Sequence, residues 1–426
     1  MTARVDLHVL THGSMRGDWL SACLKSLENE PVNIHIIDNN DRCIGDGRIH
    51  GFSTGSAEFV ASVDSDDVLL PGAIQACIDA LDANPDAVAA FTDHIIVDEN
   101  LTPMRPGVST GTGQWDIKKM PWLGGYCEHI CVFRRNAVLP FLHKMAGVHV
   151  GACHLLRGCV ASLGDFVHVE RNGVLFRQHE NNTHRTATPA DLMPIYAEIF
   201  ETLREAGRLQ LHRVDVHVLW CHEPLAWLHE CLASLSNEPV NVYLCGGIAG
   251  HVGKARALAF ERGNAEFVSF VDGDDAVEPG CFAAALAVLD ARPAVVSTYC
   301  DVRVLDVEGR EAGNGYVKGP WRPWRQLWTL AEVHHCHVMR REAVMPYLEE
   351  LCRWESLEEW VLMGLLARHG MHWHIPRKLY RFRQHGAYQR AGSLITAAMR
   401  QRGFDLCAGA LTDLHRRGVR QPDHGA

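Results

Sequence analysis

The stretch Phe59-Val-Ala-Ser-Val-Asp-Ser-Asp-Asp67 ends an apolar, strand-like run with three carboxylates, and it recurs as Phe267-Val-Ser-Phe-Val-Asp-Gly-Asp-Asp275. Carboxylates crowded at a strand end repel one another, and a divalent cation that prefers hard oxygen ligands, magnesium or manganese, removes that cost. A solvated turn with an Asp helix cap explains one isolated copy equally well. Two copies at equivalent places favour a cation site.

The repeat extends over the whole chain. Arg4-Val-Asp-Leu-His-Val-Leu10 returns as Arg213-Val-Asp-Val-His-Val-Leu219, and Arg177-Gln-His179 returns as Arg383-Gln-His385. A period above two hundred residues is too long for a solenoid, so the sequence predicts a tandem duplication of a whole domain. The length of 426 residues allows two domains with separate cores. We place them at 1–209 and 210–390, followed by a basic C-terminal helix or tail over 391–426.

Composition narrows the class of protein. With 47% hydrophobic and 22% charged residues the chain is not of a disordered type. A formal charge of −10 excludes a globally basic nucleic-acid binder, though not a local basic patch. The 15 cysteines are scattered without a C-x-x-C pair, and no apolar run is long enough to span a membrane. We therefore expect a soluble, cytoplasmic protein.

Hydrophobic patterning predicts the fold class. Short β-rich runs at 5–10, 32–37 and 59–63 alternate with segments of helical spacing. After the acidic cluster, one face of a helix is formed by Ile74, Cys77, Ile78 and Leu81. This order predicts an α/β fold with a Rossmann-like, mostly parallel sheet in each copy, covered by helices and binding its ligand at the carboxyl ends of the strands.

A strand ending in D-x-D-D, a Pro-Gly turn, an amphipathic helix and a closing Arg-x-His together resemble the family 2 glycosyltransferases of GT-A fold, once in each copy. The resemblance implies a nucleotide-diphosphate sugar donor, a Mn²⁺ or Mg²⁺ cofactor and inversion of the transferred sugar. It assigns ribose or metal contact to Asp64 and Asp272, and metal binding to Asp66, Asp274, His179 and His385. It also assigns donor binding to Gly45 with Arg48 and to Gly253 with Arg256, where an arginine neutralises diphosphate charge.

The copies differ where this family carries its general base. The second copy has Glu358 and Glu359, whereas the first has Ala152 and Cys153, neither of which provides the carboxylate that base catalysis needs here. An exposed first helical turn favoured by the macrodipole is the alternative explanation for the two glutamates. We expect the second copy to be the transferase and the first a degenerate partner. A functional first copy with an unusual base is the alternative.

The end of the second predicted strand differs as well. The first copy has Asp38, at the place where family members read the nucleotide base, but the second has Cys245-Gly-Gly247. Nucleotide recognition in the second copy must therefore differ, or its base specificity is relaxed.

The acceptor side is less defined. Trp321 and Trp328, like Trp115 and Trp122, are seven residues apart and fit one helical face, either to stack on a sugar or, as we favour, to pack a connecting helix. The run His334-His-Cys-His337 cannot place four adjacent residues around one tetrahedral ion. We instead assign His335 and His337 to the acceptor pocket.

The C-terminal end from Arg377 has ten Lys or Arg against three Asp. Such a patch suits a phosphate-bearing acceptor, an anionic membrane surface or a nucleic acid, including a flipped hydroxylated DNA base of a phage, or else it is an amphipathic helix packed on its domain. The predicted function is metal-dependent sugar transfer to a hydroxyl acceptor. The alternatives are a non-catalytic nucleotide-sugar or glycan-binding module and a nucleotidyltransferase.

Overall fold

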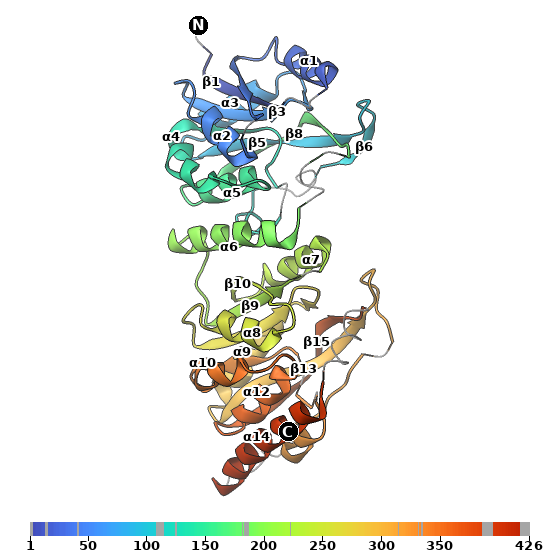
Figure 1. The fold of residues 1–426 in the computed structure, drawn as a ribbon. Coiled ribbons are helices and arrows are strands. Elements are labelled where there is room, and N and C mark those ends of the chain that lie inside the picture. Colours follow the sequence, from blue (N-terminus) through green and yellow to red (C-terminus); the bar gives the residue numbers. More distant parts are fainter. Residues whose placement is uncertain are drawn as a thin grey trace. The chain divides into compact units, whose positions relative to one another are not determined.

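The computed structural model describes the chain except residues 1–2, 13–15, 41, 108–114, 124–125, 181, 183–186, 222, 314, 331, 334, 386–394 and 418–426. The chain divides into two compact units, Met1–Leu209 and Gln210–Ala426. Each unit is an α/β structure built on one mixed, mostly parallel sheet (Figure 1). The predicted fold class is therefore confirmed.

The sheet of the first unit has parallel pairs on both sides of one antiparallel strand. Its strands are β1 (Val5–Thr11), β2 (Val32–Asp38), β3 (Phe59–Asp64), β4 (Val68–Leu69), β5 (Ala89–Val97), β6 (Pro103–Pro106), β7 (Cys131–Arg134) and β8 (Phe166–Arg177). They pair in the order β2-β1-β3-β7-β5-β8-β4, with β6 on β5. Its helices are α1 (Gly17–Ser26), α2 (Ile44–Phe52), α3 (Ala73–Ala83), α4 (Arg135–Val138), η1 (Leu139–Met145), α5 (Ala152–Val160) and α6 (Pro189–Glu205).

The second unit repeats this topology. Its strands are β9 (Val214–Trp220), β10 (Asn241–Gly246), β11 (Phe267–Asp272), β12 (Ala276–Val277), β13 (Val295–Leu305), β14 (Val338–Arg340) and β15 (Met371–Arg383), in the order β10-β9-β11-β14-β13-β15-β12. Its helices are α7 (Leu225–Leu235), α8 (Val252–Phe260), α9 (Cys281–Ala291), η3 (Pro323–Leu327), α10 (Arg341–Val344), η4 (Met345–Tyr347), α11 (Leu348–Leu351), α12 (Glu358–Leu366) and α14 (Ala397–Arg416).

The central strands explain where the acidic clusters lie. In β3 and β11 the apolar runs are almost completely buried, as expected for parallel strands covered on both faces. Each pairs in parallel with the first strand of its unit, so that Asp64 lies opposite Leu10 and Asp272 opposite Leu219. Because parallel strands end at one edge of the sheet, both clusters lie at the carboxyl edge where α/β proteins bind ligands.

Each unit closes with a long helix that packs on a helix of its own domain, α6 on α5 and α14 on α12 (Figure 1). The contact in the second unit is close, because a Cβ added to Gly364 would lie 2.1 Å from the Cys407 sulfur. Helix α14 buries Cys407, Leu411 and Leu414 in the core. Within the predicted tail 391–426, the described residues therefore form mainly a packed helix. The basic residues counted from Arg377 are not all in this helix, because Arg377, Lys378, Arg381 and Arg383 lie in β15, and Arg390 and Arg420 lie outside the described residues.

The predicted helical face of tryptophans is wrong. Residues 117–122 form turns, and only the short 3₁₀ segment η3 lies between Trp321 and Trp328. Trp321 is 1% exposed and Trp328 is 76% exposed, so the two side chains face different surroundings. The prediction assumed 3.6 residues per turn, but a single short turn with three residues per turn does not align positions seven apart. In the described residues, no helix is both long and apolar enough to cross a membrane.

Candidate active site at the carboxyl edge of the second unit

The last carboxylate of the motif fixes the local fold. Asp275 is 2% exposed and accepts hydrogen bonds from the Arg383 backbone N–H and the Tyr380 hydroxyl, both at 2.8 Å. Asp67 in the first unit accepts the matching bond from the Arg177 backbone N–H. Burial raises the pKa of Asp275 well above its usual range. This aspartate connects the motif to β15. Its Tyr380 partner was not predicted, and the only signal for it was its place just before the Arg-x-His.

The middle aspartate pairs with the predicted histidine in both units. His385 Nε2 lies 2.6 Å from Asp274 Oδ2, and His179 Nε2 lies 2.8 Å from Asp66 Oδ2. Burial is the main cause that raises the pKa of Asp274, and the His385 contact partly offsets it. The structure thus brings together the carboxylate and imidazole that the resemblance assigns to a metal, although the partners are more than a hundred residues apart.

Arg256 lies buried behind this edge. Its side chain, on α8, is 3.3 Å from Asp272 Oδ1 and 3.2 Å from Glu358 Oε1, and its guanidinium lies 3.6 Å from the centre of the Phe270 ring. Two carboxylates and an aromatic face compensate the cost of burying this cation. The partners that the structure gives Arg256 are carboxylates, so its contact with a diphosphate stays a prediction.

Gly253 has a packing role. A Cβ at this position would lie 2.3 Å from the Leu351 carbonyl oxygen, and its backbone N–H donates to the Trp354 carbonyl at 3.0 Å. Gly45 has the same close approach to the Met145 carbonyl. The glycine allows α8 to lie against the segment that leads to α12, and a donor contact is not needed to explain it.

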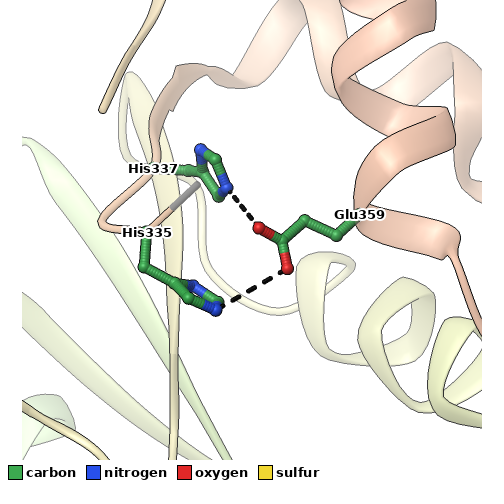
Figure 2. Close-up of side chains that lie close together, drawn as sticks. All are labelled: His335, His337 and Glu359. Atoms are coloured by element: carbon green, nitrogen blue, oxygen red, sulfur yellow. Dashed lines mark hydrogen bonds and ion pairs between the residues drawn. The ribbon is translucent and has the colours of Figure 1, made fainter. Parts of the chain in front are cut away.

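The two glutamates at the start of α12 point to different partners. Glu358 is 6% exposed and pairs with Arg256, and burial raises its pKa. The Glu359 side chain is 24% exposed, and its Oε1 lies 2.7 Å from His337 Nε2, as Figure 2 shows. An exposed helical turn therefore does not describe Glu358. The Glu359–His337 pair was missed from the sequence, where the two residues received separate roles.

The remaining predicted residues lie at varied places. His335 and His337 are buried beside Glu359, whereas Asp38 is an exposed strand end whose carboxylate accepts from the Asn40 N–H at 3.0 Å. The Trp321 ring meets His372 edge-on within the core, and the exposed Trp328 lies 5.1 Å from the Phe404 ring of α14. Acceptor contacts of these tryptophans stay predictions.

The first unit has a different group of residues at the equivalent place. Arg48 contacts Asp64, but α5 begins with Ala152 and Cys153 and supplies no carboxylate. A cavity of about 40 Å³ opens there, lined among others by Arg48, Asp64, Glu128, His129, Cys153 and Arg157.

A Rossmann-like sheet that carries paired carboxylates, a histidine and a buried arginine at its carboxyl edge defines a GT-A-like domain. Residues 14–139 match the family model described as glycosyl transferase family 2, so this part of the first unit is similar to that family. The match lies in the first unit and ends before Ala152, so it contains neither unit's base position.

The chain is also similar, at low identity, to solved structures. A crystal structure of S. aureus TarS is 12% identical with a TM-score of 0.37, covering 46% of this chain and 39% of that chain. S. aureus TarS 1-349 in complex with UDP-GlcNAc is 12% identical with a TM-score of 0.37, covering 47% of this chain and 66% of that chain. No curated protein matches the chain.

Proposed function

We propose that the chain transfers a sugar from a nucleotide-diphosphate donor to a hydroxyl acceptor with inversion, and that the second unit carries the chemistry while the first is a degenerate partner. One observation carries the proposal. Glu359 is a partly exposed carboxylate held by a buried histidine next to the acidic strand end, and the first unit has Cys153 at its position.

The donor side of the proposed site consists of Asp272, Asp274 and His385. Carboxylate oxygens with one imidazole nitrogen suit Mn²⁺ or Mg²⁺. Both carboxylates are partly buried, and Arg256 pairs with Asp272 while His385 pairs with Asp274. When bound, such an ion neutralises charge on the diphosphate leaving group. Arg256 orients the Asp272 carboxylate from behind, since it bonds that carboxylate and Glu358 together.

The acceptor side centres on Glu359. Its carboxylate takes the proton of the acceptor hydroxyl as that oxygen attacks the anomeric carbon, in one displacement. His337 is fully buried and its Nε2–H donates to Oε1, which fixes the direction of the carboxylate. Glu358, neutralised by Arg256, is the less suited of the two glutamates for this role.

Glu359→Gln in the full chain tests this proposal. With a panel of nucleotide sugars and Mn²⁺, we expect about a 100- to 10,000-fold loss of nucleotide release with unchanged donor affinity, because the amide keeps the shape but takes no proton. Cys153→Ser, the matched change in the first unit, should leave the rate unchanged. Normal turnover by Glu359→Gln would contradict the base assignment.

A non-catalytic binding module is the second candidate, favoured by the absence of an acidic residue at the end of β10, which closes at Gly246. Tight nucleotide-sugar binding by the wild-type chain without any nucleotide release would support it. Consumption of a nucleoside triphosphate with release of pyrophosphate would instead indicate a nucleotidyltransferase.

For the acceptor we propose a chemical class and no particular molecule. Two arginines of the basic tail have partners inside the second unit, since Arg402 pairs with Glu350 at 2.5 Å and Arg417 donates to the Arg368 carbonyl at 2.7 Å. These contacts support the packed-helix interpretation over a DNA- or membrane-binding patch. A glycan or small-molecule hydroxyl is therefore the acceptor class that we propose first.

A further inference from the structure

Three side chains of the second unit converge beside the acidic cluster. Figure 2 shows the His335 and His337 rings, from the segment before β14, directed at the Glu359 carboxylate on α12. His337 Nε2 lies 2.7 Å from Glu359 Oε1, and His335 Nε2 lies 3.7 Å from Glu359 Oε2. The ligand atoms of all three lie within 4.8 Å of one another. Ligands around a tetrahedral zinc ion at about 2.0–2.2 Å are roughly 3.4 Å apart, so small shifts suffice to bind one.

The two imidazoles are held in place by packing. His335 is 4% exposed and stacks on Tyr380 at a ring distance of 4.6 Å, while His337 is fully buried against Phe270 at 5.5 Å. Glu359 is the most exposed of the three side chains. This arrangement offers three preorganised ligands and one side from which water or a substrate reaches the ion, which is the pattern of an open zinc site and not of a closed structural one.

The first unit provides an independent observation. We call His335, His337 and Glu359 the trio. The residues 206 positions earlier are His129, Cys131 and Cys153. Each position therefore again has a metal-ligating residue type, although two of the three residues differ. All three line the cavity of the first unit. Within the described residues only two groups bring three ligand atoms within 4.8 Å, both in the second unit, and the inference is confined to that unit.

The trio differs in chemistry from the donor site. Two imidazole nitrogens and one carboxylate oxygen favour Zn²⁺ or Co²⁺, and the general order of divalent affinities places Mn²⁺ below both. The Asp274–His385 pair, with its neighbouring carboxylates, has more oxygen ligands, and these hard ligands favour Mg²⁺ or Mn²⁺. The other group within 4.8 Å, Asp272, Asp275 and His335, shows that the two places adjoin each other.

We propose that His335, His337 and Glu359 form a binding site for Zn²⁺ or Co²⁺, distinct from the Mn²⁺ or Mg²⁺ place at Asp274, and that its occupancy inhibits sugar transfer. The inhibition rests on the proposed function, since a divalent ion bound to the Glu359 carboxylate lowers its basicity and so weakens it as the acceptor of the hydroxyl proton. The binding itself does not depend on that function.

Co²⁺ titration of the full chain tests the binding, read by the intense visible absorption that nitrogen ligation in a four-coordinate site gives to cobalt. We expect one equivalent that Zn²⁺ displaces, and about a 100-fold weaker affinity in His337→Gln. His374→Gln is the matched control, because His374 is 7% exposed and lies 2.8 Å from the Asp301 carboxylate, outside the trio. Asp274→Asn should also retain the spectrum, since it alters the other place.

Three results would overturn the site: no cobalt spectrum in the wild type, the same affinity in His337→Gln, or loss of the spectrum in His374→Gln as well. Should His337→Gln fail to fold, Glu359→Gln serves in its place, because the amide keeps the His337 contact but is a poor metal ligand. Its affinity should fall by a similar factor, and an unchanged affinity would refute the site.

Zn²⁺ titration of the transfer reaction in excess Mn²⁺ tests the inhibition. We expect a loss of rate that follows the zinc occupancy measured by cobalt displacement, and recovery with a zinc-selective chelator. Transfer that persists at full occupancy would overturn the inhibitory role. A chain that binds cobalt through the trio but transfers from no donor would refute the proposed function and leave the metal site standing.

Discussion

Helix α5 of the first unit begins with Ala152 and Cys153, and helix α12 of the second begins with Glu358 and Glu359, although the two helices have the same place in the same sheet topology. The strand-end carboxylates are equal in number in both units, and the second of them pairs with a histidine in each. The D-x-D-D motif therefore accompanies the fold in both units. The start of the helix is where the units diverge chemically.

The buried arginine shows how far this divergence reaches. Arg256 lies on the Phe270 ring and bridges Asp272 and Glu358. Arg48 contacts Asp64 beside a cavity of about 40 Å³. Ser62, which is the equivalent of Phe270 in the first unit, lines that cavity. Loss of the helix carboxylate and loss of the aromatic support thus occur together. The first unit keeps the arginine without the two groups that position it in the second.

The largest effect that separates the units is expected from the paired aspartates. Asp274→Asn should lower transfer by about 1,000-fold, because it weakens the charge that holds a cation against the diphosphate. Asp66→Asn is the same change in the first unit, and the factor by which it lowers the transfer rate should be smaller by at least about tenfold. Initial rates of nucleotide release at saturating donor and Mn²⁺ measure both. Equal losses would show that both units take part in transfer and would contradict the assignment of the chemistry to the second unit.

A smaller effect is expected from the equivalent tryptophans. Trp321 is buried edge-on against His372, and its replacement by Ala should destabilise the second unit by about 3 kcal/mol. Trp115 is only partly buried and stacks on Phe166 at 4.6 Å, so Trp115→Ala should cost the first unit less. Hydrogen exchange in each unit of the full chain reports both changes. Trp328→Ala, with its exposed ring, is the control and should stay within about 0.5 kcal/mol of wild type.

Part of this architecture was predictable because it depends on local pattern and on repetition. The apolar runs of β3 and β11 and the carboxylates that end them show in the sequence, and the repeat shows that both belong to one kind of domain. The antiparallel strands β7 and β14 were not predicted, since no periodicity indicates that a short run such as Val338–Arg340 inserts between two parallel pairs.

The candidate site was predictable in its residues and less so in its pairings. The D-x-D-D and Arg-x-His motifs pointed to Asp274 and His385, and these side chains lie together. The contact of His337 with Glu359 joins a loop to a helix start, and nothing in the spacing of those residues indicates it. The helical face of Trp321 and Trp328 failed because Pro323 begins a short 3₁₀ turn between them.

The smallest of the predicted differences concerns pH. His372 in the second unit is 2% exposed; its Nδ1 accepts from the Ser297 hydroxyl at 2.6 Å and its Nε2–H donates to the Met363 carbonyl at 2.8 Å. Both ring nitrogens are satisfied by the neutral form, and burial lowers the pKa of His372 to about 3. At the equivalent places the first unit has Phe166 paired with Ala89, which do not titrate.

Between about pH 6.5 and pH 3 the unfolded chain therefore binds a proton at His372 that the folded second unit does not bind. The free energy of unfolding consequently rises with pH across this window and falls on acidification, by up to about 1.4 kcal/mol per pH unit. Ser297→Ala with His372→Phe installs the first unit's pair and should flatten that slope. Asp275 and Glu358, whose pKa values burial raises, act in the opposite direction in both proteins. The difference between wild type and double variant, measured by hydrogen exchange in the second unit, thus isolates His372, and equal slopes would show that this histidine is charged in the folded state.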